Sequence, residues 1–243
     1  MKEIAIDVKN VSLRYRIMKR QSIKAIFSGK GSKSSDFFTA VDDVSFSLEK
    51  GTIMGIIGKN GSGKSTLLNT IAGIMSPDDG NIDLHGNSVS LLSIGVGFQK
   101  NLSGRDNILL CGMMLGFSKK EVLSKMDEII EFSELGTFID SPVRTYSSGM
   151  YSKLAFSITA ILETDIILID EVLSVGDAKF KKKSYAKMKE LISDANRTVL
   201  IVSHSNSTLE ELCDCLMWLH DGRIKMFGDT KEVLDAYNEY SGT

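Results

Sequence analysis

Three stretches of the chain are apolar with almost no interruption. They cover residues 53–58 (IMGIIG), 166–170 (IILID) and 198–203 (TVLIVS). Strands that are buried on both faces of a parallel sheet have this pattern, whereas a strand with one wet face alternates. Residues 118–135 and 151–162 instead repeat apolar side chains at helical spacing. Strands and helices that alternate in this way predict an α/β fold around a parallel sheet.

The amino-terminal part of the chain is patterned differently. Ile4, Ile6 and Val8 alternate with polar residues, and VDDVSFSLEKG at 41–51 repeats the alternation. Period-two alternation indicates strands with one buried face, so we expect an antiparallel β edge here. Residues 101–160 carry mostly helical patterns, which predicts a helical subdomain inserted between the first two buried strands.

The carboxyl-terminal part predicts a hairpin and a closing helix. Asp221 and Gly222 form a pair that tolerates positive φ in a tight turn, and apolar residues flank them on both sides. Asp229 and Glu232 then have the spacing of a helix capping box, which predicts a final helix.

Composition narrows the class of protein. With 243 residues, of which 42% are hydrophobic, the chain can form one large domain over 1–243. The net charge of -2 gives no reason to expect a nucleic-acid partner. No run reaches the roughly 18 apolar residues that a membrane span needs. Cys111, Cys213 and Cys215 are an odd number with no CxxC, which suits buried thiols in a reducing cytosol better than a metal site.

The stretch GKNGSGKST at 58–66 lies between the first buried strand and a helix-like segment. Gly58, Gly63, Lys64 and Ser65 fit the pattern GxxxxGK[ST] in the strand-to-helix context that it requires. The glycines let successive backbone N–H groups face one concavity, where the lysine reaches phosphates and the serine binds Mg²⁺. A nucleoside triphosphate and Mg²⁺ are therefore the expected ligands. The expected binding residues of this loop are Gly58, Asn60, Gly61, Ser62, Gly63, Lys64, Ser65 and Thr66.

Two acids follow the second buried strand. We expect Asp170 to hold the Mg²⁺ hydration shell and Glu171 to polarise the attacking water as a catalytic base. An acidic strand end alone is more often a solvated turn, and it is the phosphate loop that changes this interpretation. The two motifs together do not distinguish a kinase, a GTPase and a transport ATPase.

The sequence YSSGM at 146–150 makes that distinction, because it resembles the LSGGQ signature of the ATP-binding cassette (ABC) family. The resemblance covers essentially the whole chain in the family's order of motifs. These are the phosphate loop, Gln99, the signature, IILIDE, SVGD at 174–177 and His204. It implies a phosphate-loop (RecA-like) ATPase core with an antiparallel β edge and an inserted helical subdomain, binding ATP and Mg²⁺.

The resemblance also implies roles for individual residues. Each ATP of a head-to-tail homodimer lies between the phosphate loop of one copy and the signature of the other, which Ser147, Ser148 and Gly149 represent here. Gln99 is expected to touch Mg²⁺ and the attacking water next to a membrane subunit. His204 is expected to contact the γ-phosphate and keep Glu171 and the water aligned. The residue expected to communicate between the two sites is Asp177.

Within the family, the chain is similar to exporters of bacterial cell-surface polysaccharides such as O-antigen, capsule and teichoic acid. The resemblance is densest over 129–180, where IDEVLSVGDAKF stands in place of a more usual EPTSALD. It implies a peripheral subunit on the cytoplasmic face of the cell membrane, working with permease subunits on a lipid-linked glycan. The alternatives are the ATPase of a small-molecule exporter or importer, and an ABC ATPase without a transport role.

A basic insert at 14–38 separates the first two strands, with no acidic residue between Asp7 and Asp36. Residues 17–27 have amphipathic spacing and are expected to contact anionic lipid headgroups or the pyrophosphate of the glycan carrier. The alternative is a solvated basic loop. The resemblance implies an aromatic residue that stacks on adenine, for which Tyr15 is the expected residue and Phe37 or Phe38 the competing ones.

Overall fold

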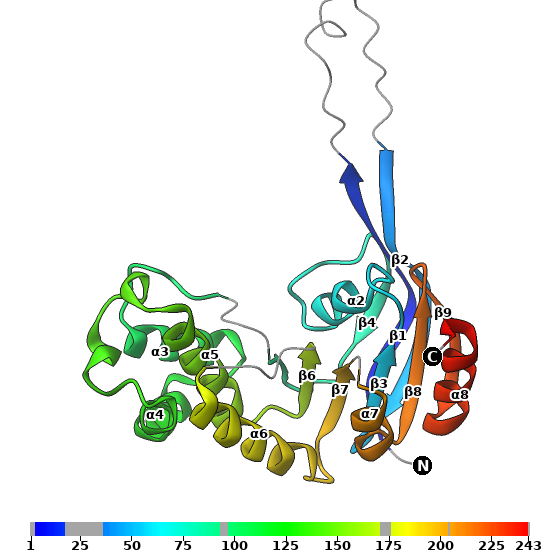
Figure 1. The fold of residues 1–243 in the computed structure, drawn as a ribbon. Coiled ribbons are helices and arrows are strands. Elements are labelled where there is room, and N and C mark those ends of the chain that lie inside the picture. Colours follow the sequence, from blue (N-terminus) through cyan, green and yellow to red (C-terminus); the bar gives the residue numbers. More distant parts are fainter. Residues whose placement is uncertain (1–2, 18–35, 93–96, 171–175, 204, 243) are drawn as a thin grey trace, which may run out of the picture.

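The chain forms two sheets and a helical region (Figure 1). The computed structural model describes residues 3–17, 36–92, 97–170, 176–203 and 205–242. One sheet has six strands in the spatial order β5 (Val89–Leu91), β6 (Ile166–Asp170), β7 (Thr198–Val202), β3 (Ile53–Ile57), β8 (Cys215–His220) and β9 (Arg223–Asp229). The other has three strands in the order β2 (Asp36–Glu49), β1 (Ile4–Ile17) and β4 (Asp79–Asp83).

The larger sheet is parallel from β5 to β8, and β9 is its antiparallel edge strand. The three apolar runs form β3, β6 and β7, as their pattern predicts. Asp221 with φ 47° and Gly222 with φ 80° make the turn between β8 and β9, so the predicted hairpin is confirmed. The final helix, α8 (Thr230–Ser241), begins at Asp229, whose carboxylate accepts from the backbone N–H groups of Lys231 and Glu232.

Both faces of the larger sheet are covered. On β6, Ile166 and Leu168 point into a core shared with the antiparallel sheet and α2 (Lys64–Ile71), whereas Ile167 and Ile169 point into a second core that includes Phe180. The second core is closed by α6 (Ala178–Ile192), and α7 (Asn206–Leu212) lies beside it (Figure 1). This double coverage explains why the strand is apolar at consecutive positions.

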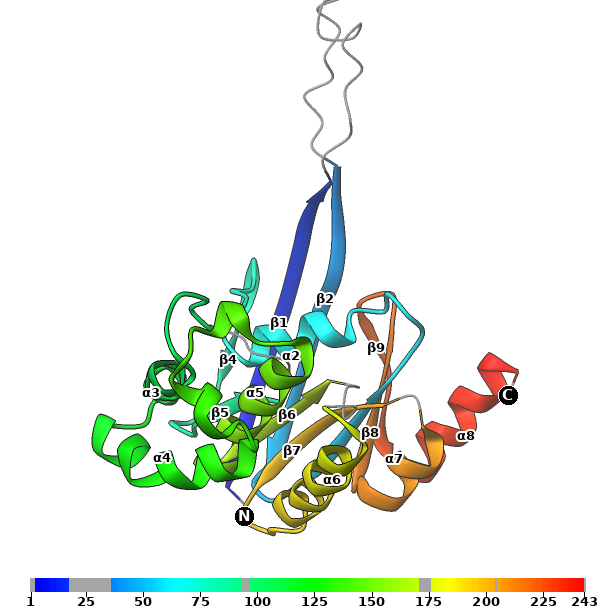
Figure 2. The same ribbon diagram turned by 60° about the vertical axis from the view of Figure 1, so that its left-hand side comes forward.

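The antiparallel sheet reaches into the basic insert. β1 and β2 are 14 residues each and project from the body together (Figure 2). Tyr15 pairs with Phe38 and Arg16 with Phe37, so the first and last residues of the insert continue the two strands. The predicted amphipathic segment 17–27 lies outside the described residues except for Ile17, the last residue of β1.

Residues 104–162 form the helical region and pack around their own apolar core. Its elements are α3 (Gly104–Met114), α4 (Lys119–Ser133), the 3₁₀ turns η1 (Gly136–Asp140) and η2 (Val143–Thr145), and α5 (Ser148–Leu162).

None of the helices that the structure describes is long and apolar enough to cross a lipid bilayer.

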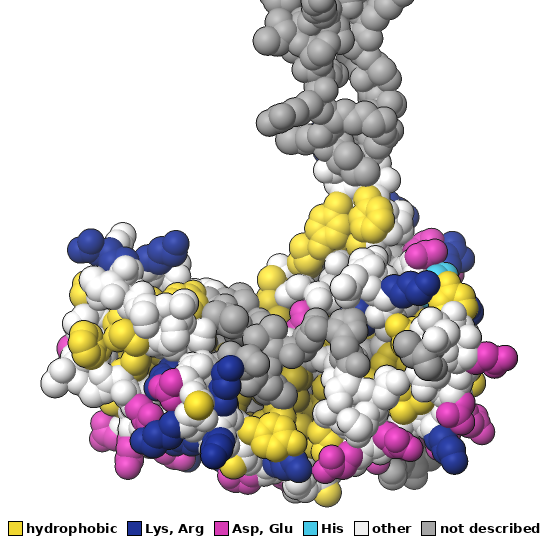
Figure 3. Space-filling model, in the orientation of Figure 1, with side chains coloured by type: hydrophobic (Ala, Val, Ile, Leu, Met, Phe, Trp, Pro, Cys, Tyr) yellow, Lys and Arg dark blue, Asp and Glu magenta, His cyan; other side chains and the backbone are white. Residues whose placement is uncertain are grey.

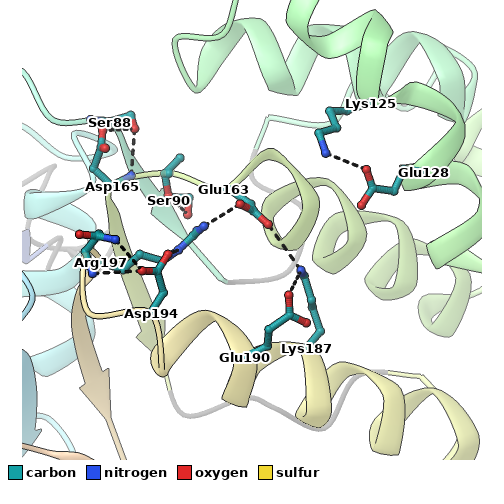
Figure 4. A network of polar contacts seen from close by, with 12 residues as sticks. Ser88, Ser90, Lys125, Glu128, Glu163, Asp165, Lys187, Glu190, Asp194 and Arg197 are labelled. Carbon is teal, nitrogen blue, oxygen red and sulfur yellow. Dashed lines mark hydrogen bonds and ion pairs between the residues drawn. The ribbon is translucent and has the colours of Figure 1, made fainter.

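Polar contacts fasten the end of α5 to the sheet (Figure 4). Glu163, the carboxyl-terminal cap of α5, accepts from Arg197 Nη2 at 2.6 Å and from Lys187 Nζ at 3.5 Å. Two residues later, Asp165 accepts from the backbone N–H and the hydroxyl of Ser88 at 2.8 and 2.6 Å. The end of the helical region is therefore held by Arg197 in the turn before β7 and by Lys187 of α6, and the segment that leads into β6 is held by Ser88 just before β5.

Candidate nucleotide-binding site

The phosphate loop lies where β3 meets α2, and two of its glycines are there because other backbone is too close. A Cβ on Gly58 would lie 2.2 Å from the carbonyl oxygen of Leu219, and one on Gly63 would lie 2.1 Å from that of Ala40. Gly63 also has φ 99°, a conformation that residues with a side chain rarely adopt. The loop thus lies in close backbone contact with both β2 and β8.

The interior of this loop fits a phosphate group. Lys64 is only 6% exposed and donates from Nζ to the carbonyl oxygens of Gly58 at 2.7 Å and Lys59 at 3.0 Å. Ser62 Oγ is buried and has no hydrogen-bond partner among the described residues. A buried ammonium group and an unsatisfied hydroxyl at the start of a helix form a site for an anion with several acceptor oxygens.

An aromatic surface continues from the loop. A cavity of about 190 Å³ is lined by Tyr15, Phe38, Ala40, Asn60, Gly61, Gly63, Lys64, Ser65 and Thr66. Tyr15 and Phe38 are paired across the two strands and so share one face, whereas Phe37 pairs with Arg16 and does not line the cavity. Tyr15 Oη lies 3.4 Å from Thr66 Oγ1 of the loop. The cavity therefore offers a π surface and a phosphate loop to one ligand, and it favours Tyr15 and Phe38 over Phe37.

The strand register brings Asp170 to the same edge of the sheet. Val202 of β7 pairs with Ile56 of β3 on one side and with Asp170 of β6 on the other. Since neighbouring strands lie roughly 5 Å apart, Asp170 is about two strand spacings from the strand that leads into the loop. Glu171 follows β6 directly in the sequence and His204 comes two residues after the end of β7, and both lie outside the described residues.

The oxygen atoms at this edge suit Mg²⁺. The metal binds one or two carboxylates together with waters and phosphate oxygens, so it needs no cluster of protein ligands. The described residues contain no group of three or more His, Cys, Asp and Glu placed to hold a metal. Asp170 and the hydroxyl of the exposed Ser65 are the hard oxygen ligands expected from the sequence, and they fit this mode of binding.

The signature forms the start of α5, away from the cavity of its own chain. Ser147 is the helix cap, and its Oγ accepts from the backbone N–H of Met150 at 3.2 Å. Ser147 and Ser148 are exposed, and a Cβ on Gly149 would meet its first neighbour only at 3.9 Å. Tyr146 donates from Oη to the carbonyl oxygen of Phe138 at 2.8 Å, which fixes the helix start within its subdomain. The signature thus presents an open helix terminus to the outside of the chain.

The position of Gln99 depends on a residue that the sequence did not reveal. Asn107 of α3 is fully buried, and its Oδ1 accepts from the backbone N–H of Gln99 at 2.7 Å. Its Nδ2 donates to the carbonyl oxygens of Gln99 at 3.1 Å and Ser103 at 2.8 Å. The side chain of Gln99 is exposed. An asparagine inside a helix was the available signal, because such residues compete for backbone hydrogen bonds.

Asp177 begins α6 and is held by a lysine of the signature helix. Its Oδ1 accepts from the backbone N–H groups of Lys179 and Phe180, each at 3.0 Å. Its Oδ2 accepts from Lys153 Nζ at 2.7 Å. The hydrogen bond from Lys153 is the main cause of lowering the pKa of Asp177 to about 2, and the two backbone donors add to it. The sequence pattern alone gave no sign of Lys153.

This shift predicts a pH-dependent contribution to stability. A carboxylate with a depressed pKa stabilises the folded state above its unfolded pKa of roughly 4, and the contribution is lost as the pH falls toward about 2. Asp177→Asn keeps the helix cap and removes the ionisation. We therefore expect the difference in unfolding free energy between the wild type and Asp177→Asn to shrink between pH 5 and pH 3 in urea titrations. A difference that is constant over this range would contradict the assignment.

Fold and site together define a phosphate-loop nucleotide-binding protein. The sequence model of the family described as ABC transporter matches residues 41–174, and the chain belongs to that family. It is 42% identical over 241 residues to the O-antigen export system ATP-binding protein RfbB of Myxococcus xanthus, covering 98% of this chain and 55% of that protein. It is 43% identical over 241 residues to the teichoic acids export ATP-binding protein TagH of Lactococcus lactis, covering 98% of this chain and 51% of that protein. The chain thus spans about half the length of these relatives.

A solved structure supports the fold. The dimeric post-hydrolysis state of the ATP-binding cassette MJ0796 with ADP and Pi superposes with a TM-score of 0.69 at 20% identity, covering 93% of this chain and 98% of the other. The predicted fold class, a phosphate-loop core with an antiparallel β edge and an inserted helical subdomain, is confirmed.

Proposed function

We propose that the chain is the ATP-hydrolysing subunit of an exporter that moves a lipid-linked cell-surface polysaccharide through a separate membrane permease. The observation that carries the ATPase part is the cavity that joins Tyr15 and Phe38 to the phosphate loop. The similarity over 98% of the chain to ATP-binding proteins of O-antigen and teichoic-acid export supports the choice of cargo class.

Hydrolysis in this proposal rests on position and charge. Lys64 and the amides at the start of α2 bind the β and γ phosphates, and Tyr15 stacks on adenine. Ser65, Gln99 and, through water, Asp170 would hold Mg²⁺, which would neutralise part of the phosphate charge. Glu171 takes a proton from the attacking water. The oxygen of that water bonds to the γ-phosphorus, and the bond between the γ-phosphorus and the bridging oxygen of the β-phosphate breaks, which releases ADP. His204 contacts the γ-phosphate and keeps Glu171 and the water aligned.

A second copy completes the site. The exposed start of α5, with Ser147, Ser148 and Gly149, would meet the γ-phosphate bound by another copy. Ser148 stands where the family usually has glycine, and as the exposed first residue of the helix it leaves the amides of this turn accessible. The solved structure of the cassette MJ0796 is dimeric, which supports a dimer, and a head-to-tail homodimer is the proposed arrangement.

The permease is proposed to dock next to Gln99. An apolar cavity of about 400 Å³ lies between the helical region and the sheet, and Phe98, Met114 and Ile74 are among its lining residues. Met114 is 64% exposed and Ile74 is 44% exposed, which is unusual for large apolar side chains that line one cavity. An apolar segment of the permease that fills this cavity would touch the residue next to Gln99 and so sense occupancy of the site.

A hydrophobic surface lies on β1 and β2 where these strands border the basic insert, and part of it lines the nucleotide cavity. Hydrophobic side chains gather where β1 and β2 leave the body (Figure 3), and Tyr15, Phe37 and Phe38 are exposed there. Tyr15 and Phe38 are assigned to the nucleotide. Phe37, on the other face of the strands, is left for a contact of the basic insert, which we propose to act near lipid headgroups or the glycan carrier on the cytoplasmic face of the membrane.

Co-purification tests this proposal. The tagged chain is recovered from detergent-solubilised membranes of its own host, and the bound molecules are identified by mass spectrometry. A polytopic membrane protein together with a lipid-linked glycan is the expected result. Recovery with ribosomes, or with no membrane protein, would leave an ATPase but remove the export function.

A surface variant tests the docking cavity in the same experiment. Met114→Glu places a charge in the apolar cavity and is expected to lower permease recovery at least about tenfold, since burying an unpaired charge costs more than 1.4 kcal/mol. ATP binding should stay intact. Leu123→Glu is the matched control, because Leu123 is 51% exposed on α4 and does not line the cavity. Equal recovery with both variants would place the permease elsewhere.

A further inference from the structure

Lys153 connects three helices at the signature end of α5. It follows Ser148 by five residues, and its side chain is 14% exposed. Nζ lies 2.7 Å from Asp177 at the start of α6 and 3.7 Å from Glu134 at the end of α4. Lysines that are largely buried are usually paired, and Lys153 has two carboxylate partners. The position of this ammonium group is therefore set by two other elements.

Glu134 is itself held in place. It caps α4 in the left-handed conformation, with φ 57°, which few residues other than glycine adopt. Its carboxylate lies within 3.4 Å of Lys179 and 3.6 Å of Lys183, both on α6. Two carboxylates and three ammonium groups thus form one network around the start of α6, and Lys153 is its member on the signature helix.

The alkyl chain of Lys153 also makes packing contacts, in addition to the ion pairs of its ammonium group. A Cβ on Gly176 would lie 3.0 Å from Lys153 Cε and 3.2 Å from Cγ, so the alkyl chain covers the residue just before Asp177. Nζ also lies 5.1 Å from the ring centroid of Phe180, which is fully buried under this corner. The contact joins α5 to α6 over several atoms, which limits sliding of one helix against the other.

A second ion pair joins α5 and α6 at the carboxyl-terminal end of α5. Glu163 at the end of α5 reaches Lys187 of α6 only at 3.5 Å, and Arg197 at 2.6 Å is its nearer partner. Loss of Lys187 would leave Glu163 still paired. Loss of Lys153 would leave Asp177 without a lysine from the signature helix. Of these two ion pairs, Lys187–Glu163 is supported by Arg197, whereas Lys153 is the partner of Asp177 on α5.

We propose that Lys153 is a positioning residue that locks the signature end of α5 to Asp177, so that the signature and the start of α6 move as one body. This inference rests on the proposed function. In a head-to-tail dimer, the start of α5 meets the γ-phosphate of the ATP that the second copy binds. A movement of the start of α5 is then passed through Lys153 to Asp177, the residue expected to communicate between the sites. Binding at one site would thereby adjust the other.

Turnover and nucleotide binding separate this role from a structural one. Lys153→Met keeps most of the alkyl stem and removes the charge, and Asp177→Asn keeps the helix cap and removes its charge. Each variant is expected to lower kcat for ATP hydrolysis about tenfold, while the affinity of the phosphate loop for ATP stays within about twofold of the wild type. The reason is that a small misplacement of a group in the transition state lowers the catalytic rate more than it lowers substrate affinity. The double variant should be no slower than either single variant, because both remove one interaction.

Two further variants make the test decisive. Lys153→Arg restores a cation at the same place and should return kcat to within about threefold of the wild type. Lys187→Met removes a lysine from the same helix pair at its other end and should leave kcat within about twofold. Wild-type kcat in Lys153→Met, or additive losses in the double variant, would overturn the role of Lys153. A wild-type chain without ATP turnover would instead contradict the proposed function.

Discussion

Lys64→Met is expected to reduce ATP turnover at least about 100-fold, the range seen when one positioned donor to a transition state is removed. The ammonium group of Lys64 is held inside the loop by the carbonyl oxygens of Gly58 and Lys59. A phosphate oxygen that replaces these acceptors gains a charge-assisted hydrogen bond in a buried place, where such bonds are strongest. Methionine fills a similar volume but donates nothing, so phosphate charge is left uncompensated.

Lys59→Met is the matched control for this variant. Lys59 is in the same loop, but its side chain is exposed and its Nζ lies 4.8 Å from the ring centroid of Tyr240 on α8. Its turnover should remain within about threefold of the wild type, because an exposed cation–π contact contributes only about 0.5–1 kcal/mol. Steady-state phosphate release and urea unfolding are measured on both variants. Comparable loss of turnover in both would mean that loop charge, and not the position of Lys64, is what matters.

The strands of the larger sheet could be predicted because burial on both faces leaves a mark in the sequence. The runs at 53–58, 166–170 and 198–203 are apolar at consecutive positions, and they became β3, β6 and β7. Their order in the sheet could not be predicted in this way. β7 comes last of the three in the chain but lies between the other two, so Asp170 at the end of β6 is two strands away from the strand that leads into the phosphate loop.

The candidate site was predictable where its chemistry is local in sequence. The loop at 58–66 has its residues at fixed spacing, so the pattern identifies them without a structure. Tyr15 and Phe38 form one surface only through the register of β1 and β2, which the basic insert between them obscures. Asn107 and Lys153 act through contacts with residues that a helix or a turn brings near. Such contacts depend on packing, and the periodicity of one element does not contain them.

Gly63→Ala is expected to lower the free energy of unfolding by about 3 kcal/mol or more. Two costs add up at this residue. A left-handed conformation costs a residue with a Cβ roughly 1–2 kcal/mol, and forcing a methyl group into packed surroundings costs about 1–3 kcal/mol. The second cost is at its upper end here, because the obstacle is the carbonyl oxygen of Ala40 at 2.1 Å, which belongs to the backbone of β2 and not to a flexible side chain.

Gly61→Ala separates these two costs. Gly61 has φ 82°, but a Cβ there would meet nothing within 4 Å, so only the conformational cost of roughly 1–2 kcal/mol applies. Urea unfolding of both variants is the measurement. A clear gap between them means that the loop is held rigidly against β2 and reaches the nucleotide with its amides already in place. Equal losses would mean that the loop moves away from Ala40 at little cost, and the phosphate site would then have to be formed by the ligand.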